Sequence, residues 1–127
     1  MQDIIITASL ATAGNTLYVP VPCRGTVAGV RVVSSLQMDN DGTLKVSRGT
    51  DDVNQVTVPE NTAAGGVLDG VPDSTNAHLV FDPDSDTAAE RVIKIVTDST
   101  FHGGNAQTTI HIKYDTGAYV KEDPLHA

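Results

Sequence analysis

The strongest constraint on the fold is an alternation of apolar and polar residues that repeats at every second position. It is clearest over residues 107–114, where the apolar members of the pattern are Ile110, Ile112 and Tyr114. A period of two marks a β-strand with one buried face. The same pattern recurs along the chain, and no window of ten or more residues has a convincing helical period. The sequence therefore predicts an all-β protein.

Turn-forming residues divide the chain into eight or nine short strands. The predicted strands cover residues 4–10, 17–21, 26–36, 44–48, 53–58, 77–81, 90–97, 107–114 and 118–121. Many short strands between turn signals favour an antiparallel β-sandwich, with a jelly roll as the first choice. An immunoglobulin-like sandwich is the weaker choice, because the chain lacks the Trp and the Cys pair typical of that fold.

Several residues modify this pattern. Pro20 cannot donate a backbone hydrogen bond, so residues 17–21 are predicted as an edge strand or a bulge. Gly29 predicts a bend or a bulge in the strand that contains it. Residues 59–76 have no clear period and are predicted as a surface loop. Residues 86–90 are predicted as a single helical turn.

The composition indicates one domain over residues 1–127, long enough to bury a core. Aromatic residues make up 4 % of the chain and Trp is absent, so Val, Ile, Leu and Ala are expected to form the core. The single cysteine, Cys23, excludes an intrachain disulfide. No apolar run approaches the roughly 20 residues of a membrane helix, and the N-terminus has no signal-peptide pattern. The chain is therefore expected to be made in a cytoplasm, with no membrane as partner.

The formal net charge is −8, and the excess lies in the middle of the chain. Residues 37–86 hold ten acids and two bases, whereas the remaining residues hold six of each. An acidic surface repels phosphate, so no nucleic acid is expected as a partner. Burying unpaired carboxylates is costly. The acidic middle is therefore expected to face solvent, and the end of the sandwich near the termini is expected to meet a partner.

No residue pattern indicates catalysis, a cofactor or a metal. Asp82, Asp84 and Asp86 are spaced two apart but lack the other oxygens of a calcium site, and such aspartates usually form turns. Cys23 lies in no peptidase signature and is expected to be a half-buried hydrophobe. The four histidines show no zinc spacing, and His111 is expected to face solvent.

The run Ile4-Ile5-Ile6 is apolar on both faces of a strand, so both faces need to be covered. Either the strand is buried on both sides within one subunit, or it is exchanged with, or laid against, a neighbour. In the second case, residues 1–8 are predicted to form an extended N-terminal arm or an exchanged strand. The residues predicted to contact a partner or another copy are Ile4, Ile5, Ile6, Leu17, Val19 and Val21.

Three stretches of the chain are similar in pattern to a known family. They are Ala11-Thr12-Ala13-Gly14-Asn15-Thr16-Leu17, the strand from Gly25 to Val33, and the block from His78 to Pro83 that continues through residues 91–97 to Tyr114. On these residues the chain resembles the small capsid decoration proteins of tailed bacteriophages, also called cement or head-fibre-like proteins. The resemblance implies a β-rich, commonly trimeric subunit on the outer surface of a capsid, where it bridges copies of the major capsid protein.

From this resemblance the chain is expected to be a viral structural protein and not an enzyme. It would stabilise a phage head as a homotrimer, located in the virion after assembly in the host cytoplasm, through shape-complementary burial and strand addition. The alternative is a receptor- or glycan-binding module of a head or tail fibre. Such modules usually expose several aromatic residues, and the only tyrosines are Tyr18, Tyr114 and Tyr119. A secreted calcium-dependent β-sandwich is a third interpretation, opposed by the missing signal peptide.

Overall fold

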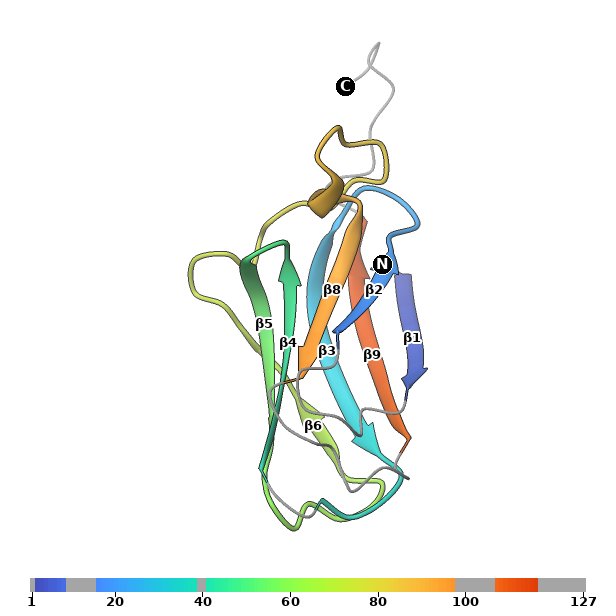
Figure 1. The fold of residues 1–127 in the computed structure, drawn as a ribbon, viewed down its shortest axis with the longest axis vertical. Coiled ribbons are helices and arrows are strands. Elements are labelled where there is room, and N and C mark those ends of the chain that lie inside the picture. Colours follow the sequence, from blue (N-terminus) through green and yellow to red (C-terminus); the bar gives the residue numbers. More distant parts are fainter. Residues whose placement is uncertain (1, 9–15, 39–40, 98–106, 117–127) are drawn as a thin grey trace.

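Two antiparallel β-sheets pack face to face in the computed structural model, which describes residues 2–8, 16–38, 41–97 and 107–116 (Figure 1). The nine strands of these residues are β1 (Gln2–Ala8), β2 (Thr16–Pro20), β3 (Thr26–Ser34), β4 (Gly42–Arg48), β5 (Asp51–Val58), β6 (Val67–Asp69), β7 (Val71–Pro72), β8 (Val92–Thr97) and β9 (Thr108–Asp115). One sheet has the order β1-β9-β3-β6, and the other has the order β2-β8-β4-β5-β7. The prediction of an all-β antiparallel sandwich is confirmed.

The core lies between the sheets and is built from the inward faces of the strands. In β9 every second residue from Thr108 to Tyr114 is buried, and the residues between them are more exposed. The side chains of Ile110 and Ile112 are 0 % exposed. Fully burying one such side chain contributes about 1.5–3 kcal/mol. The core cluster consists of Val21, Val27, Val30, Val32, Met38, Leu44, Val46, Val53, Val56, Val58, Phe81, Ile93, Ile95, Ile110, Ile112 and Tyr114.

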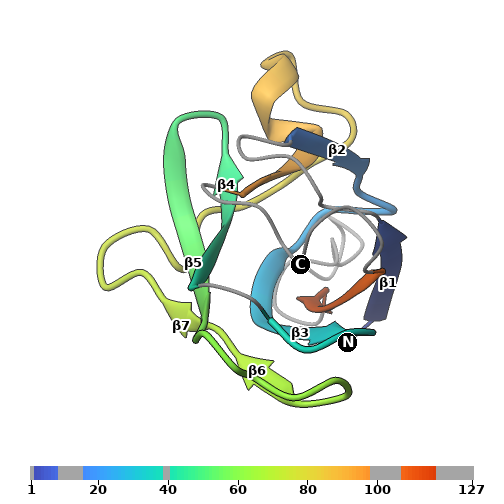
Figure 2. The same ribbon diagram turned by 60° about the horizontal axis from the view of Figure 1, so that its bottom comes forward.

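A corner at Gly70 joins the two sheets on one side of the sandwich. Directly before Gly70, β6 pairs with β3 in one sheet, and directly after it, β7 pairs with β5 in the other. The Gly70 N–H donates to the Val30 carbonyl at 2.8 Å, which holds the corner on β3. On the opposite side the outer strands are β1 and β2, each of which pairs with one neighbour in the described part of the chain (Figure 2).

Three local predictions are confirmed. The strand that contains Pro20, β2, lies at the edge of its sheet. The register of β3 with β9 shifts between Val27 and Gly29, as a bulge requires. Residues Ala88–Glu90 form a single 3-10 turn. The two strands with the clearest alternation, β8 and β9, follow one another in the sequence but belong to different sheets.

Two local predictions are wrong. The loop expected at residues 59–76 contains β6 and β7, which are too short to show a period. The strand expected at residues 77–81 is absent, because turns lead up to Phe81, which makes one isolated bridge with Gly25. The strand expected at residues 118–121 lies outside the described residues.

A polar side chain is packed in the core beneath the corner. Asn54 of β5 is 2 % exposed, and its Oδ1 has no hydrogen-bond partner among the described residues. A Cβ atom built on Gly70 would overlap this oxygen and would approach Val56 Cγ2 to 3.0 Å. The corner can therefore close over Asn54 because residue 70 has no side chain.

Gly70→Ala is expected to lower the free energy of unfolding by about 1–3 kcal/mol, the usual cost of overpacking a core. The matched control is Gly29→Ala, because a Cβ at Gly29 would come no closer than 3.9 Å to Lys113 Cδ. Chemical denaturation of both variants measures the difference. Adding Asn54→Ala to Gly70→Ala should cost less than the sum of the two single changes, since the overlap is then removed. A Gly70→Ala variant as stable as the wild type would show that no overlap exists.

Candidate interaction surface

The four outer strands of the two sheets differ in how well their free edges are protected against pairing with another chain. An unpaired edge is usually blocked by proline, by charge or by being very short. β2 contains Pro20 and β7 contains Pro72, while β6 has three residues and includes Asp69. β1 has seven residues and no proline, and its one charged residue, Asp3, contacts His111 of the neighbouring strand β9. It is therefore the least protected edge of the described sandwich.

The side chains of β1 are not covered on both faces. Ile4 and Ile6 point inward and are half-buried against the core, whereas Ile5 lies on the outer face and is 66 % exposed. Complete burial of the run Ile4-Ile5-Ile6 within one subunit is thus contradicted. β1 is held to β9 by its ladder and by a contact of 3.0 Å between Asp3 Oδ1 and His111 Nε2 on the outer face. His111 accordingly lies on the outer face of the sheet, as expected.

β2 presents a similar half-buried face on the same side of the sandwich. Leu17 and Val19 pack against the core and are partly buried, and Tyr18 between them is 64 % exposed. Both views show β1 and β2 as neighbours on the side opposite the Gly70 corner (Figures 1 and 2). We call the side formed by β1 and β2 the open side. It brings together five of the six residues predicted to contact a partner.

Val21 is the predicted contact residue that does not lie on the open side. Its side chain is 5 % exposed and belongs to the core cluster. The alternation of Leu17, Val19 and Val21 correctly indicates that the three side chains lie on one face. After β2 ends at Pro20, this face is buried in the core and no longer lies at the sheet edge. The exposed ring of Tyr18 was not singled out as a contact, although the same alternation places it on the outer face.

The acidic residues gather at one end of the sandwich and on its corner side. The acidic end includes the β4–β5 turn and the segment between β7 and β8 (Figure 1). Its described acids are Asp51, Asp52, Asp73, Asp82, Asp84, Asp86, Glu90 and Asp115, and its described arginines are Arg24, Arg48 and Arg91. Gln2 pairs with Tyr114, so β1 begins at this same end. The start of β1 and these acids therefore lie at the same end of the described sandwich, and the expectation that the end near the termini meets a partner stays a prediction.

The reason is the antiparallel topology, which brings the start of β1 and the end of β9 to the loops that carry the acids. The acidic and the uncharged surfaces lie on opposite sides of the sandwich, not at its two ends. The strands and turns around the Gly70 corner carry Asp51, Asp52, Asp69 and Asp73, whereas β1 and β2 carry Asp3 as their one ionisable carboxylate. A contact made through the open side would thus leave the acidic residues of the corner exposed to solvent.

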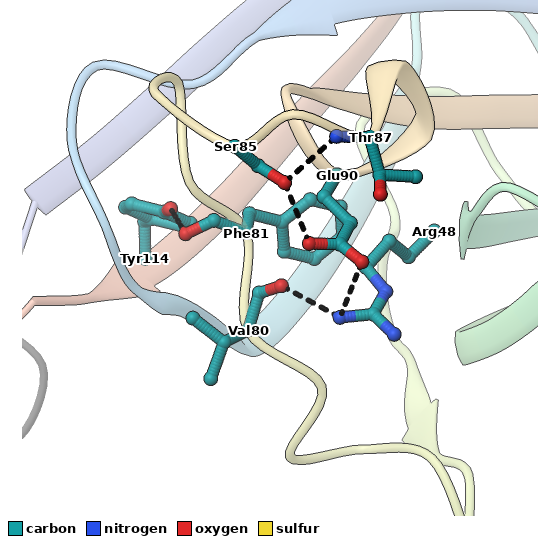
Figure 3. Close-up of polar contacts among 7 residues, drawn as sticks. All are labelled: Arg48, Val80, Phe81, Ser85, Thr87, Glu90 and Tyr114. Atoms are coloured by element: carbon teal, nitrogen blue, oxygen red, sulfur yellow. Dashed lines mark hydrogen bonds and ion pairs between the residues drawn. The ribbon is translucent and has the colours of Figure 1, made fainter.

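A polar cluster holds the loop before β8 on the acidic end (Figure 3). Arg48 Nη1 donates to the Val80 carbonyl at 2.9 Å and lies 4.0 Å from Glu90 Oε2. Ser85 Oγ donates to Glu90 Oε1 at 2.8 Å and accepts from the Thr87 N–H at 3.1 Å. These contacts join the end of β4, the loop before β8 and the 3-10 turn. They therefore hold the loop in one position.

The aspartates of the same loop form turns. Asp82 Oδ1 accepts from the Asp84 N–H at 2.9 Å, and the Asp82 carbonyl accepts from the Ser85 N–H at 3.1 Å. Within residues 2–8, 16–38, 41–97 and 107–116, no group of three or more His, Cys, Asp or Glu is placed to hold a metal. The same residues contain no helix long and apolar enough to cross a membrane.

Tyr114 closes the core at the acidic end. Its ring is 0 % exposed, and its hydroxyl donates to the Cys23 carbonyl at 2.6 Å and lies 3.4 Å from the Phe81 carbonyl (Figure 3). Cys23 itself is half-buried, as expected. Burial, with further contributions from Cys23 and Asp82, raises the pKa of Tyr114 well above its ordinary value.

No protein-family model matches the chain, and a search of curated proteins finds no significant match. The resemblance to capsid decoration proteins therefore depends only on the sequence pattern quoted above. The geometry of the open side is the independent structural observation that bears on function.

Raising the pH above about 10 is expected to destabilise the protein through Tyr114. Below that pH the phenol is protonated in both states, so it contributes no pH dependence. Above it the unfolded chain ionises while the folded chain does not, which favours unfolding. Urea denaturation at several pH values measures this loss. Tyr114→Phe should remove it while costing about 0.5–1.5 kcal/mol at neutral pH, because the Cys23 carbonyl loses its donor.

The control for this prediction is Tyr18→Phe, a change on the outer face of β2 where the side chain is 64 % exposed. It should leave the alkaline loss of stability in place. An alkaline loss that persists unchanged in Tyr114→Phe would assign the effect to other groups.

Proposed function

We propose that this protein is a capsid decoration protein, which binds the outer surface of a phage head and stabilises it by bridging subunits of the major capsid protein. The observation that carries the proposal is the unprotected edge of β1, with Ile5 exposed on it. A strand of this kind can add to a sheet of a neighbouring subunit through backbone hydrogen bonds, while its side chains supply apolar contacts.

The order of the strands supports a narrower prediction of the fold. β1 pairs with β9, β2 with β8, β3 with β6 and β4 with β5, so the strand pairs are nested. Nested pairs are expected in a jelly roll, which has two Greek keys and occurs in viral capsid proteins. We infer a jelly-roll sandwich with β6 and β7 as one bent strand. A shared fold by itself does not assign a function.

The half-buried residues of the open side support self-association, and the number of three subunits comes from the resemblance to decoration proteins. Ile4, Ile6, Leu17 and Val19 are partly buried in the single subunit and would become fully buried against another copy. A contact on this side leaves the acidic residues of the corner side in solvent, which avoids the cost of burying unpaired charge. The same side would therefore serve trimer formation, capsid attachment or both.

The alternative, a receptor- or glycan-binding module, has less support. Sugar sites usually stack the ligand on exposed aromatic rings. Among the described residues Tyr18 is an exposed tyrosine, whereas Tyr114 is buried. One exposed tyrosine ring in the described part of the chain, on an edge strand, fits a protein contact better than a sugar platform.

Ile5→Lys is expected to abolish binding to capsid shells assembled from the major capsid protein of the same genome. A lysine on an edge strand blocks pairing, and Ile5 is exposed, so the fold should survive. Val67→Lys is the matched control, because Val67 is 55 % exposed on β6, the other edge of the same sheet. Co-sedimentation with the shells measures binding, and circular dichroism verifies the fold. Loss of binding in Val67→Lys but not in Ile5→Lys would place the capsid contact on β6 and overturn its assignment to β1.

Light scattering is expected to give a mass three times the 13.3 kDa of one chain. Association is expected because the open side is incompletely buried in one subunit, and the number three comes from the resemblance. Leu17→Lys would place a charge in the predicted subunit contact and should shift the equilibrium to monomers, with Val71→Lys, exposed on the corner side, as control. A monomer at high concentration, without threefold assembly on the capsid, would rule out the trimer.

A further inference from the structure

The outer face of β2, β8 and β4 differs in charge from the rest of the molecule. These three strands lie side by side in one sheet and contain no aspartate or glutamate, in a chain that has 16 acids (Figure 1). Lys94 of β8 and Lys45 of β4 point outward, because the residues on either side of each are 0 % exposed and face the core. We call this surface the lysine face.

The pairing of the strands brings both lysines next to an exposed aromatic ring. Tyr18 lies directly opposite Lys94, and Val96, the next outward residue of β8, lies opposite Lys45. The Tyr18 side chain is 64 % exposed. Opposite residues of an antiparallel pair have Cβ atoms about 4.5–5.5 Å apart, and diagonal neighbours are about 7–8 Å apart. The ring and the two lysines therefore border one patch, with Val96 between them.

Neither lysine has an ionic partner in the described part of the chain. The outer face of the other sheet is different, because two of its bases contact acids. Arg31 Nε lies 2.7 Å from Asp69 Oδ1. His111 Nε2 lies 3.0 Å from Asp3 Oδ1. Neighbouring like charges on a sheet repel one another when no opposite charge lies between them. A carboxylate that is added to the lysine face is therefore attracted by both lysines.

The first acid across the sheet from Lys94 is Asp52 of β5. Ser47 lies between them in the same row, and its hydroxyl donates to Asp52 Oδ1 at 2.7 Å. Two strand spacings, about 10 Å, separate the backbones of Lys94 and Asp52. The Debye length at physiological salt is about 8 Å, so charges beyond it are largely screened. The lysine face can therefore attract an acidic group although the net charge of the chain is −8.

The lysine face is continuous with the open side through β2. Leu17 and Val19 on the inner face of this strand are partly buried and belong to the open side, while Tyr18 lies between them on the outer face. Exposed tyrosines are frequent anchors of protein interfaces. A partner that contacts the open side reaches the lysine face across β2 without leaving the surface.

We propose that the lysine face binds an acidic segment of a protein partner. Carboxylates of this segment pair with Lys45 and Lys94, and Tyr18 packs against the chain that carries them. The inference rests on the proposed function only for the identity of the partner, which is then the outer surface of the capsid. A nucleic acid also offers negative groups, but its phosphates extend far enough to meet the acids of the corner side and the acidic end.

Co-sedimentation with shells of the major capsid protein tests the lysine face. Lys94→Gln and Lys45→Gln should each weaken binding by about two- to fivefold, and Tyr18→Ala by about tenfold, with the fold verified by circular dichroism. Lys113→Gln is the matched control, because it removes the same charge from the outer face of the other sheet. Equal losses in Lys113→Gln and Lys94→Gln, or unchanged shell binding in both variants of the lysine face, would overturn the inference.

Peptide binding to the isotopically labelled full chain, followed by nuclear magnetic resonance, separates the inference from the proposed function. A peptide of alternating glutamate and glycine should shift the amide signals of β2, β8 and β4, whereas its glutamine counterpart should not. A chain that shows these shifts but does not bind shells would overturn the proposed function and retain the inference. No shifts, shifts elsewhere, equal shifts with the glutamine peptide, or larger shifts with an oligothymidylate would overturn the inference.

Discussion

The close packing of the Gly70 backbone over Asn54 determines which side of the sandwich is closed. It lets the chain pass from β6 to β7 without an intervening loop, so the two sheets share one continuous side. The opposite side must then end in two separate edges, β1 and β2. The half-buried apolar residues of the open side follow from this arrangement.

The sequence predicted the elements whose side chains alternate over enough residues. β3, β8 and β9 show the period because one face of each is buried along most of its length. β6 and β7 have three and two residues, which is too few for any period. The segment before Phe81 was misassigned for a different reason. Phe81 is a core side chain that a loop carries inward, and composition does not distinguish this from a strand.

The open side was predictable only in part. The run Ile4-Ile5-Ile6 indicated a strand that needs cover on both faces, either within its own subunit or from a neighbour, because consecutive residues of a strand point to opposite faces. Which of the three isoleucines points outward could not be read from the sequence. The pairing of β1 with β9 places Ile5 on the outer face. The hollow that residues of β5, β7 and the segment after β7 form at the corner could not be predicted. Asp52 and Asp73 are separated by 20 residues in the sequence, and only the two-residue pairing of β5 with β7 brings them to one space.

The pairing of the first strand with the last has a consequence for how the chain folds. The contact between Asp3 and His111 spans 108 positions, so nearly the whole chain must be made before β1 can pair within its own subunit. Contacts between distant residues form slowly, and strands that wait unpaired are open to other chains. During synthesis from neighbouring ribosomes, the first β9 to appear near a waiting β1 can belong to another copy. The ratio of self-paired to exchanged strands would then be set by the crowding of nascent chains, before any finished subunit meets another.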